Sequence, residues 1–265
     1  MKPVMISGTG GPEPDNTDNA AVIRKDDKFY MLYRNPGSHI SLAFSDNGTT
    51  WTSYSHNPVL SADYDEDLSG RGMENPRLVV YQKVYYVYYT TRDGLCVATS
   101  TDLINWTNHG TALGRKIYNG AVLMNPGNKA VKLDSQFVMY SSTASGPVIS
   151  YSRDLIHWEI QNVEFDLPEK YKPAEICMAL TDYHENGDHI ILFLRNTVPG
   201  RALISKRDPQ KIIQYSEDAF LIPGSGEPTG RPVAETWAAI MKHKGKWWLW
   251  YKDTDLAIHL ATTEE

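Results

Sequence analysis

A strand-forming unit of about 53 residues recurs five times along this chain of 265 residues. Each unit begins at a polar or acidic residue, continues into an apolar strand, turns, and enters a second strand rich in aromatic or aliphatic residues. A polar loop and a third strand follow. A strand repeat of this length predicts the blades of a β-propeller. We therefore predict an all-β fold, a single five-bladed β-propeller over residues 1–265, with antiparallel four-stranded blades around a central channel.

Three of the third strands are followed by a turn that ends in tryptophan. These turns are Asp46–Trp51, Asp102–Trp106 and Asp154–Trp158. An Asp side chain can accept hydrogen bonds from backbone amides in a turn, and the Trp ring is expected to pack against its blade. The fourth copy is degenerate and runs from Asp208 to Tyr215.

The last unit ends soon after its third strand, at Glu265. We expect the N-terminal segment, residues 3–6, to pair into the last blade and close the ring. Closure of this kind would remove the open edges of an unclosed sheet.

The composition argues against several classes of function. The formal net charge is −6 and the pI is about 5.8, and no basic run is present, so no nucleic-acid partner is expected. No apolar stretch approaches the roughly 20 residues that span a membrane. Cys96 and Cys177 are expected to be small buried hydrophobes rather than a disulfide. The N-terminus lacks the apolar region of a signal peptide, which favours a cytoplasmic protein; a secreted form with its signal removed is the alternative.

A propeller brings the start of every first strand to one end of its channel. Four acids stand at or beside these predicted starts: Asp18, Glu74, Glu175 and Glu235. The same positions supply polar and aromatic candidates for substrate contact: Asn19, Asn75, Arg77, Tyr118, Asn119, Arg195 and Trp237. No His or Cys pair has the spacing of a metal site, so neither a metal nor another cofactor is predicted.

Acids that converge with amides, arginines and an aromatic ring are typical of a carbohydrate site. Glycoside cleavage uses two carboxyl groups, one protonated to assist the leaving oxygen and one ionised to activate water or attack carbon. A carbohydrate substrate is therefore predicted, with Trp237 as the stacking platform. Glu74 has a structural alternative, an ion pair with Arg71 or Arg77.

The repeat resembles the five-bladed glycosidase superfamily, which includes glycoside hydrolase families 32, 43, 68, 117 and 130. The third-strand phrases at residues 97–106 and 149–158 look typical of those enzymes. Resemblance to family 43 implies a base on the first blade and an acid on the fourth, roles that Asp18 and Glu175 can take. Asn19 stands closer than Asp18 to the usual base position, and Tyr118 and Asn119 stand where a pKa-tuning Asp is expected.

Family 130, which acts on mannosides, carries a Glu-Asp-Pro-Arg sequence that resembles Glu74–Arg77 of this chain. The Asp that serves as proton donor in that family is replaced by Asn75, and an amide cannot act as an acid. The resemblance therefore implies a divergent relative of both families.

We predict an inverting glycoside hydrolase with Glu175 as acid and Asp18 as base. Glu235 and Glu74 are tuning or substitute acids. The first alternative is a phosphorylase of the family 130 type that holds phosphate with Arg71, Arg77, Arg195 and Lys116. The second is a sugar-binding propeller without catalysis. A sialidase-like enzyme is a weaker alternative, because that fold has six blades.

Overall fold

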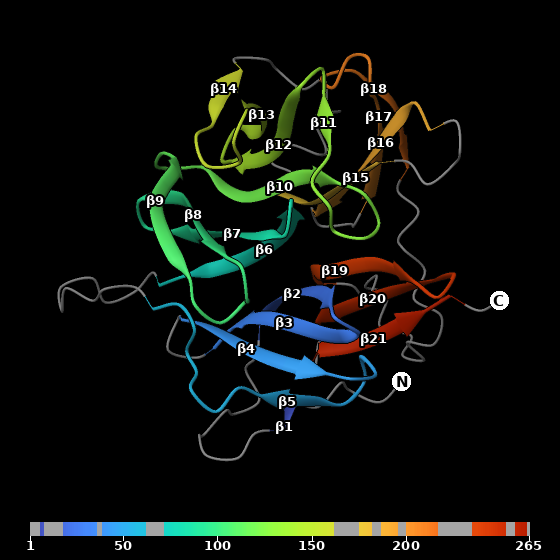
Figure 1. Ribbon diagram of the computed structural model, residues 1–265. Helices are drawn as coiled ribbons and strands as arrows, with labels where there is room; N and C mark the ends of the chain where they lie inside the picture. The colour runs from blue at the N-terminus through green and yellow to red at the C-terminus, as the bar shows by residue number, and fades with distance from the viewer. Residues whose placement is uncertain are drawn as a thin grey trace.

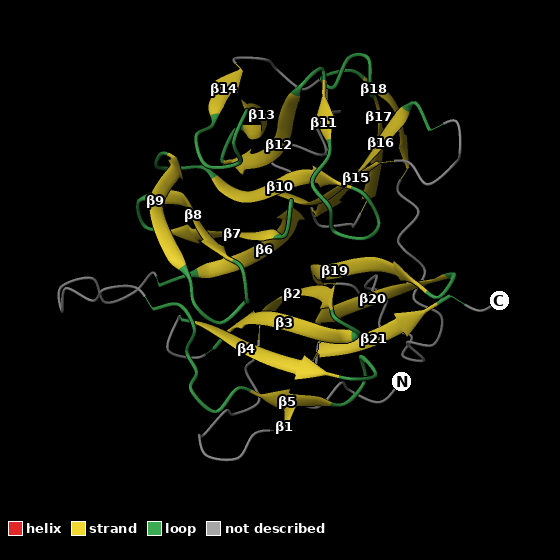
Figure 2. Ribbon diagram, viewed as in Figure 1, coloured by secondary structure: helices red, strands yellow, loops and turns green. Residues whose placement is uncertain are grey.

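Each of the five repeats folds into an antiparallel blade, and the described strands form a five-bladed β-propeller (Figure 1). The computed structural model describes residues 6–7, 18–35, 39–61, 72–161, 175–181, 187–195, 200–216, 235–252 and 258–263. These residues form strands, turns and loops, with no helix among them (Figure 2). A search of the same residues finds no helix long and apolar enough to cross a membrane.

The strands follow the repeat closely. Blade one comprises β2 (Asp18–Lys25), β3 (Lys28–Arg34), β4 (Ile40–Ser45) and β5 (Trp51–Ser53), joined at its edge by β1 (Ile6–Ser7). Blade two comprises β6 (Glu74–Tyr81), β7 (Val84–Thr91), β8 (Gly94–Ser100) and β9 (Thr107–Leu113). Blade three comprises β10 (Tyr118–Met124), β11 (Lys132–Leu133), β12 (Gln136–Thr143), β13 (Gly146–Ser152) and β14 (Glu159–Gln161). Blade four comprises β15 (Glu175–Thr181), β16 (His189–Arg195), β17 (Gly200–Ser205) and β18 (Ile212–Ser216). Blade five comprises β19 (Glu235–His243), β20 (Lys246–Lys252) and β21 (Ile258–Thr262).

The first strands of the blades surround the channel. Each first strand contacts the next one around the ring, in the order β2, β6, β10, β15 and β19. Because β19 also contacts β2, the ring is closed (Figure 1). Between blades three and four the first strands also pair in parallel, with Leu123 opposite Ala179. The five separate strand starts that the repeat predicted therefore meet around one axis.

The second strands supply the core between the blades. Tyr33, Tyr88, Tyr140 and Trp250 lie in the middle of these strands and are completely buried. Large aromatic side chains bury more apolar area than any others, and that burial is the main favourable term in folding. The aromatic second strands of the sequence are therefore the packing surfaces between neighbouring blades.

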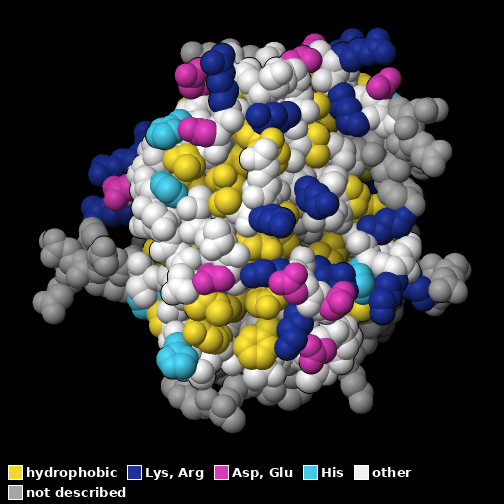
Figure 3. Space-filling model, in the orientation of Figure 1, with side chains coloured by type: hydrophobic (Ala, Val, Ile, Leu, Met, Phe, Trp, Pro, Cys, Tyr) yellow, Lys and Arg dark blue, Asp and Glu magenta, His cyan; other side chains and the backbone are white. Residues whose placement is uncertain are grey.

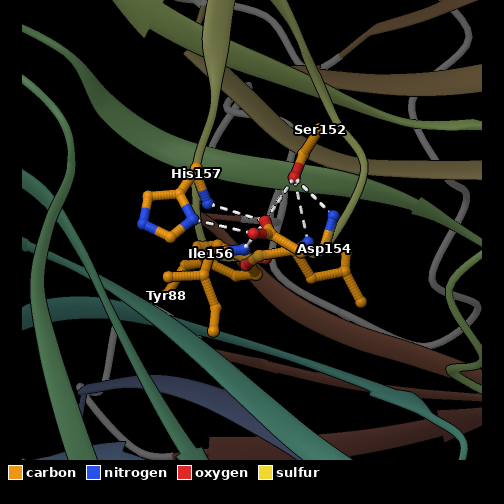
Figure 4. Close-up of polar contacts among 6 residues, drawn as sticks. Tyr88, Ser152, Asp154, Ile156 and His157 are labelled. Atoms are coloured by element: carbon orange, nitrogen blue, oxygen red, sulfur yellow. Dashed lines mark hydrogen bonds and ion pairs between the residues drawn. The ribbon is translucent and has the colours of Figure 1, made fainter.

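The outer turns contain the predicted Asp and Trp residues, and Figure 4 shows the polar contacts of the turn at Asp154. The Asp154 carboxylate accepts backbone hydrogen bonds from Ile156 and His157, both at 2.9 Å, and Ser152 Oγ donates to it at 3.1 Å. Burial alone would raise the pKa of the Asp154 carboxyl, but these bonds and the His157 side chain hold the pKa well below its usual range. Trp158 at the end of the turn is buried.

In blade one the predicted turn residue is wrong by one position. The side chain that accepts the backbone bonds of Thr49 and Thr50 is Asn47, whereas Asp46 forms an exposed ion pair with Lys28. Asn47 is two residues after Ser45, as Asp154 is two after Ser152. Because an amide oxygen accepts these bonds as a carboxylate does, an Asp-based pattern missed it.

The expectation that the N-terminal segment pairs into the last blade is wrong for its described residue. Ile6 pairs in parallel with Trp51 of β5, at the outer edge of blade one. Residues 3–5 lie outside the described residues. Among the described residues, side chains join blades one and five.

Aromatic side chains form the junction between blades one and five. Phe29 stacks on Trp248 with ring centroids 5.5 Å apart, and Trp51 meets Trp250 edge-on at 6.3 Å. Trp250 Nε1 donates a hydrogen bond to the Gly48 carbonyl at 2.9 Å. A β-carbon at Gly48 would lie 2.7 Å from the Trp248 ring, so this junction needs glycine at position 48.

We expect Gly48→Ala to lower the free energy of unfolding by about 2–4 kcal/mol. Gly48 has φ +74°, a region costing other residues about 1–2 kcal/mol, and the new methyl group would overpack the Trp248 contact at about 1–3 kcal/mol. The matched control is Gly110→Ala, because Gly110 has φ +77° but no atom within 4 Å of the added carbon. Chemical denaturation measures both, and equal losses would show that the Trp248 contact adds nothing.

A loop of blade three covers the far end of the channel. Where blades one, two and five have a tight turn, residues 125–131 cross toward neighbouring blades. Asn128 Nδ2 donates to the Val22 carbonyl of β2 at 3.1 Å, and the backbone of Asn128 bonds Val80 of β6. The Pro126 carbonyl accepts the backbone N–H of Lys242 in β19. This loop therefore links blade three to blades one, two and five.

Candidate active site

Every first strand contains an irregularity close to its start, at the end of the channel opposite the Asn128 loop. The pairing register shifts between Asp18 and Ala21, and at the corresponding points of β6, β10, β15 and β19. Bulges of this kind re-aim side chains and are common beside active sites. In three blades the shift contains an asparagine with positive φ: Asn19 (55°), Asn75 (54°) and Asn119 (58°).

The four predicted acids begin four of the five first strands. Asp18, Glu74, Glu175 and Glu235 are the first residues of β2, β6, β15 and β19. Since these strands surround one channel, their starts lie at one end of it, as the sequence predicted. The structure describes only the backbone of Asp18, Glu175 and Glu235, so their catalytic roles and the spacing of their carboxyl groups stay predictions.

Basic residues stand directly across from three of these acids. Asp18 pairs in register with Arg34, Glu175 with Arg195, and Glu235 with Lys252. Because each second strand runs antiparallel to the first, its last residue lies at the same end of the channel as the acid. The channel mouth therefore combines carboxyl groups with several cations.

Glu74 is held by a residue of the neighbouring blade. Arg34 Nη2 lies 3.6 Å from Glu74 Oε1, and both side chains are about one third exposed. The sequence offered Arg71 or Arg77 as partners, and the partner in the structure is Arg34. An ion pair this open to solvent contributes about 0–1 kcal/mol, so its main effect is to position the Glu74 carboxylate.

Arg77 is a buried cation of the channel wall. It is 8% exposed, and its Nη1 donates to the Pro76 carbonyl at 3.3 Å. Arg77 also lines the channel inside the ring, and its part in substrate binding stays a prediction. Lys116 lies on an exposed turn just before β10, and Arg71 lies outside the described residues.

Tyr118 begins β10 and is half-buried, opposite Ser142 of β12. Arg195 ends β16, and Trp237 lies inside the irregular start of β19. Both are placed by their backbone alone. All three positions belong to the predicted substrate-binding set, and their roles stay predictions.

The three asparagines are joined across three blades. Asn19 Nδ2 donates to Asn75 Oδ1 at 2.6 Å, and Asn75 Nδ2 donates to Asn119 Oδ1 at 2.8 Å. Although each residue was a predicted contact, the sequence gave no reason to link them. The shared signal is their common place, one residue after the strand start in each of the first three blades.

Inside the ring the channel is narrow. Its walls come from all five first strands, and Asn128 lies at the end that the blade-three loop covers. Its volume is about 30 Å³, room for about two water molecules. A sugar ring does not fit inside, so substrate must be held at the mouth, where the acids, cations and asparagines lie.

The described residues hold no group of three or more His, Cys, Asp or Glu side chains arranged for a metal ion. Cys96 and Cys177 are buried and unpaired with each other, as predicted. On the face in Figure 3, Lys and Arg side chains are interspersed with Asp and Glu, and the described side chains of that face form no basic stripe.

Comparison with known proteins identifies the family. Residues 5–179 match glycoside hydrolase family 130, described as β-1,4-mannooligosaccharide phosphorylase. The 1,2-β-oligomannan phosphorylase of Thermoanaerobacter sp. (strain X514) is 25% identical over 237 residues, 78% of this chain and 75% of that protein.

Solved structures agree. A glycosyl hydrolase from Bacteroides ovatus is 25% identical and superposes with a TM-score of 0.75 over 95% of this chain and 85% of its own. A structure from work on GH130 glycoside hydrolases that target β-1,2 mannosidic linkages in Candida mannan is also 25% identical, with a TM-score of 0.76 and the same coverage. This chain therefore belongs to glycoside hydrolase family 130, a family of glycoside-active enzymes.

Proposed function

We propose that this chain cleaves β-mannosides by phosphorolysis at the channel mouth. The observation that carries the proposal is the register of cations with acids: Arg34, Arg195 and Lys252 end their strands opposite Asp18, Glu175 and Glu235. A phosphate dianion needs several such cations, especially beside carboxylates that would otherwise repel it. The phosphorylase relative named above supports the same class of substrate and reaction.

The reaction needs one acid from the protein. A phosphate oxygen attacks the anomeric carbon from the face opposite the leaving oxygen, and the glycosidic C–O bond breaks as the new C–O bond forms. A proton passes to the leaving oxygen. The products are α-mannose 1-phosphate and a shortened mannoside. Since phosphate is itself the nucleophile, no base is required to activate water.

Glu175 is the proposed proton donor. The amide of Asn75 cannot supply a proton, although it occupies the position of the family's acid. Glu175 begins β15 at the mouth, next to the apolar Ile176, which is completely buried. A general acid must carry its proton when the leaving oxygen departs, and substitution of Glu175 by glutamine tests this role.

Hydrolysis is the second candidate. Four acids at one channel end are more than phosphorolysis requires, and a relative at 25% identity comes from work on hydrolases of this family. In that reaction Asp18 would activate water on the face opposite Glu175, and both products would be free sugars.

The test is a comparison of products with and without inorganic phosphate. Purified protein is incubated with β-1,2-mannobiose or β-1,4-mannobiose, and the sugars are separated and quantified. We expect α-mannose 1-phosphate that depends on phosphate. Phosphate-independent release of mannose alone would overturn phosphorolysis in favour of hydrolysis. Absence of both products, together with measurable mannobiose binding, would indicate a sugar-binding propeller without catalysis.

A further inference from the structure

The three linked asparagines have a fixed direction. Asn19 donates to Asn75 and Asn75 donates to Asn119, so the bonds run one way, from blade one through blade two to blade three. We call this set the asparagine arc. Asn19 is 4% and Asn119 1% exposed, and the positive φ angles place all three side chains equivalently.

Both ends of the arc are unfilled. Asn119 Nδ2 and Asn19 Oδ1 are buried atoms without a hydrogen-bond partner in the described part of the protein. Buried polar groups are normally paired, because losing water without a replacement bond costs free energy. The end at Asn119 lacks an acceptor, and the end at Asn19 lacks a donor.

The remaining two blades do not continue the arc. The residues one position after the strand start, the place of the three asparagines, are Ile176 in β15 and Thr236 in β19. Isoleucine has no polar group, and threonine carries a hydroxyl in place of an amide. At the described strand starts no amide therefore continues the arc, and the gap between its two ends lies toward blades four and five.

We propose that two neighbouring hydroxyl groups of the glycosyl ring close this gap. A hydroxyl both accepts and donates: one accepts from Asn119 Nδ2, and the other donates to Asn19 Oδ1. Phosphate fits this pair of ends poorly, because it is mainly an acceptor and the Asn19 carbonyl would repel it. The arc therefore holds the neutral sugar, and phosphate is left to Arg34, Arg195 and Lys252.

Asn75 is the positioning residue of the arc. It accepts from Asn19 and donates to Asn119, so both ends keep their direction. A carboxylate at position 75 could accept from Asn19 but could not donate to Asn119 Oδ1. Asn119 would then turn its amide toward position 75 and present its oxygen to the sugar. The replacement of the family's acid by Asn75 thus fixes which hydroxyl must accept and which must donate.

This inference deepens the proposed function, on which it rests only for the identity of the sugar. Binding is measured by calorimetry without phosphate, so that absence of phosphorolysis does not affect the result. The probes are methyl β-mannoside and its monodeoxy and monodeoxyfluoro analogues. Fluorine accepts weakly and cannot donate, so it distinguishes the two ends.

For the wild-type protein we expect two neighbouring deoxy positions that each weaken binding by about tenfold or more. At one of them, facing Asn119, the fluoro analogue recovers part of the loss, and at the other it does not. In Asn75→Asp the recovery disappears. Asn128→Asp is the matched control, since Asn128 is also a buried asparagine with φ 60° but lies at the covered end of the channel. In this control variant the fluoro analogue should still recover part of the lost binding.

The proposal is overturned if methyl β-mannoside does not bind, if all deoxy analogues bind equally, or if fluorine recovers binding at both positions or at neither. If the fluoro analogue still recovers binding in a folded Asn75→Asp protein, Asn75 does not position the arc. If that variant does not fold, as judged by circular dichroism, the wild-type analogue series decides the direction of the arc by itself.

Discussion

Glu175→Gln is expected to lower cleavage of a natural mannoside by about 10²–10⁴-fold while leaving the fold intact. Glutamine keeps the shape and hydrogen-bonding reach of glutamate but carries no transferable proton. An aryl mannoside with a good leaving group needs less protonation, so its cleavage should fall much less. Steady-state rates on both substrates measure the difference. Full activity of the variant on the natural substrate would remove Glu175 as the acid, and Glu235 would be tested next.

Asp18→Asn is the companion variant, and it distinguishes the two candidate reactions. If water is the nucleophile, loss of the Asp18 base slows cleavage of natural and aryl substrates alike, by a similar factor of about 10²–10⁴. If phosphate is the nucleophile, no base is needed and phosphorolysis persists. The measurement is the rate of mannose 1-phosphate formation. If this rate falls as much in Asp18→Asn as in Glu175→Gln, the phosphorolytic mechanism is contradicted.

Trp250→Ala is expected to lower the free energy of unfolding by about 3–5 kcal/mol. Trp250 is completely buried between blades five and one, contacts the rings of Phe29 and Trp51, and donates to the Gly48 carbonyl. Its removal leaves a cavity at the junction that closes the ring. Urea denaturation followed by circular dichroism measures the loss.

The control for this variant lies on the same strand. Trp247 is also part of β20 but is half-buried, so Trp247→Ala creates a smaller cavity and should cost less. Equal losses for the two substitutions would contradict the view that the junction of blades one and five depends on Trp250. Trp250→Phe keeps an aromatic ring but removes the N–H donor. Its free energy of unfolding should lie between those of the wild type and Trp250→Ala.

The repeat predicted the blades because its information is local. Strand periodicity and turn residues depend on neighbours a few positions away, and they predict first strands that begin near Asn19, Asn75, Asn119, Glu175 and Thr236. The observed first strands begin at or one residue before these positions. The burial of the aromatic second strands follows from the same pattern. The one-residue error at Asp46 arose because Asn47 does the same hydrogen bonding with a different functional group.

The joints between blades were not predictable in this way. The bond from Asn19 to Asn75 spans 56 residues of sequence, and the bond from Asn75 to Asn119 spans 44. The Glu74–Arg34 pair also crosses between blades. A repeat places equivalent residues on equivalent strands, but it does not say which side chains of adjacent blades come within bonding distance.

The sequence by itself determined the number of blades and the order of the first three strands in each, because these follow from local strand and turn preferences repeated five times. Tertiary structure alone decided that Trp250 and Gly48 join blades five and one, that Ile6 pairs with blade one, and that residues 125–131 cover one end of the channel. It alone also gave the asparagine arc its direction. The physical reason is that these features depend on side-chain packing and hydrogen bonds between distant segments, whose geometry exists only once the blades are arranged around a common axis.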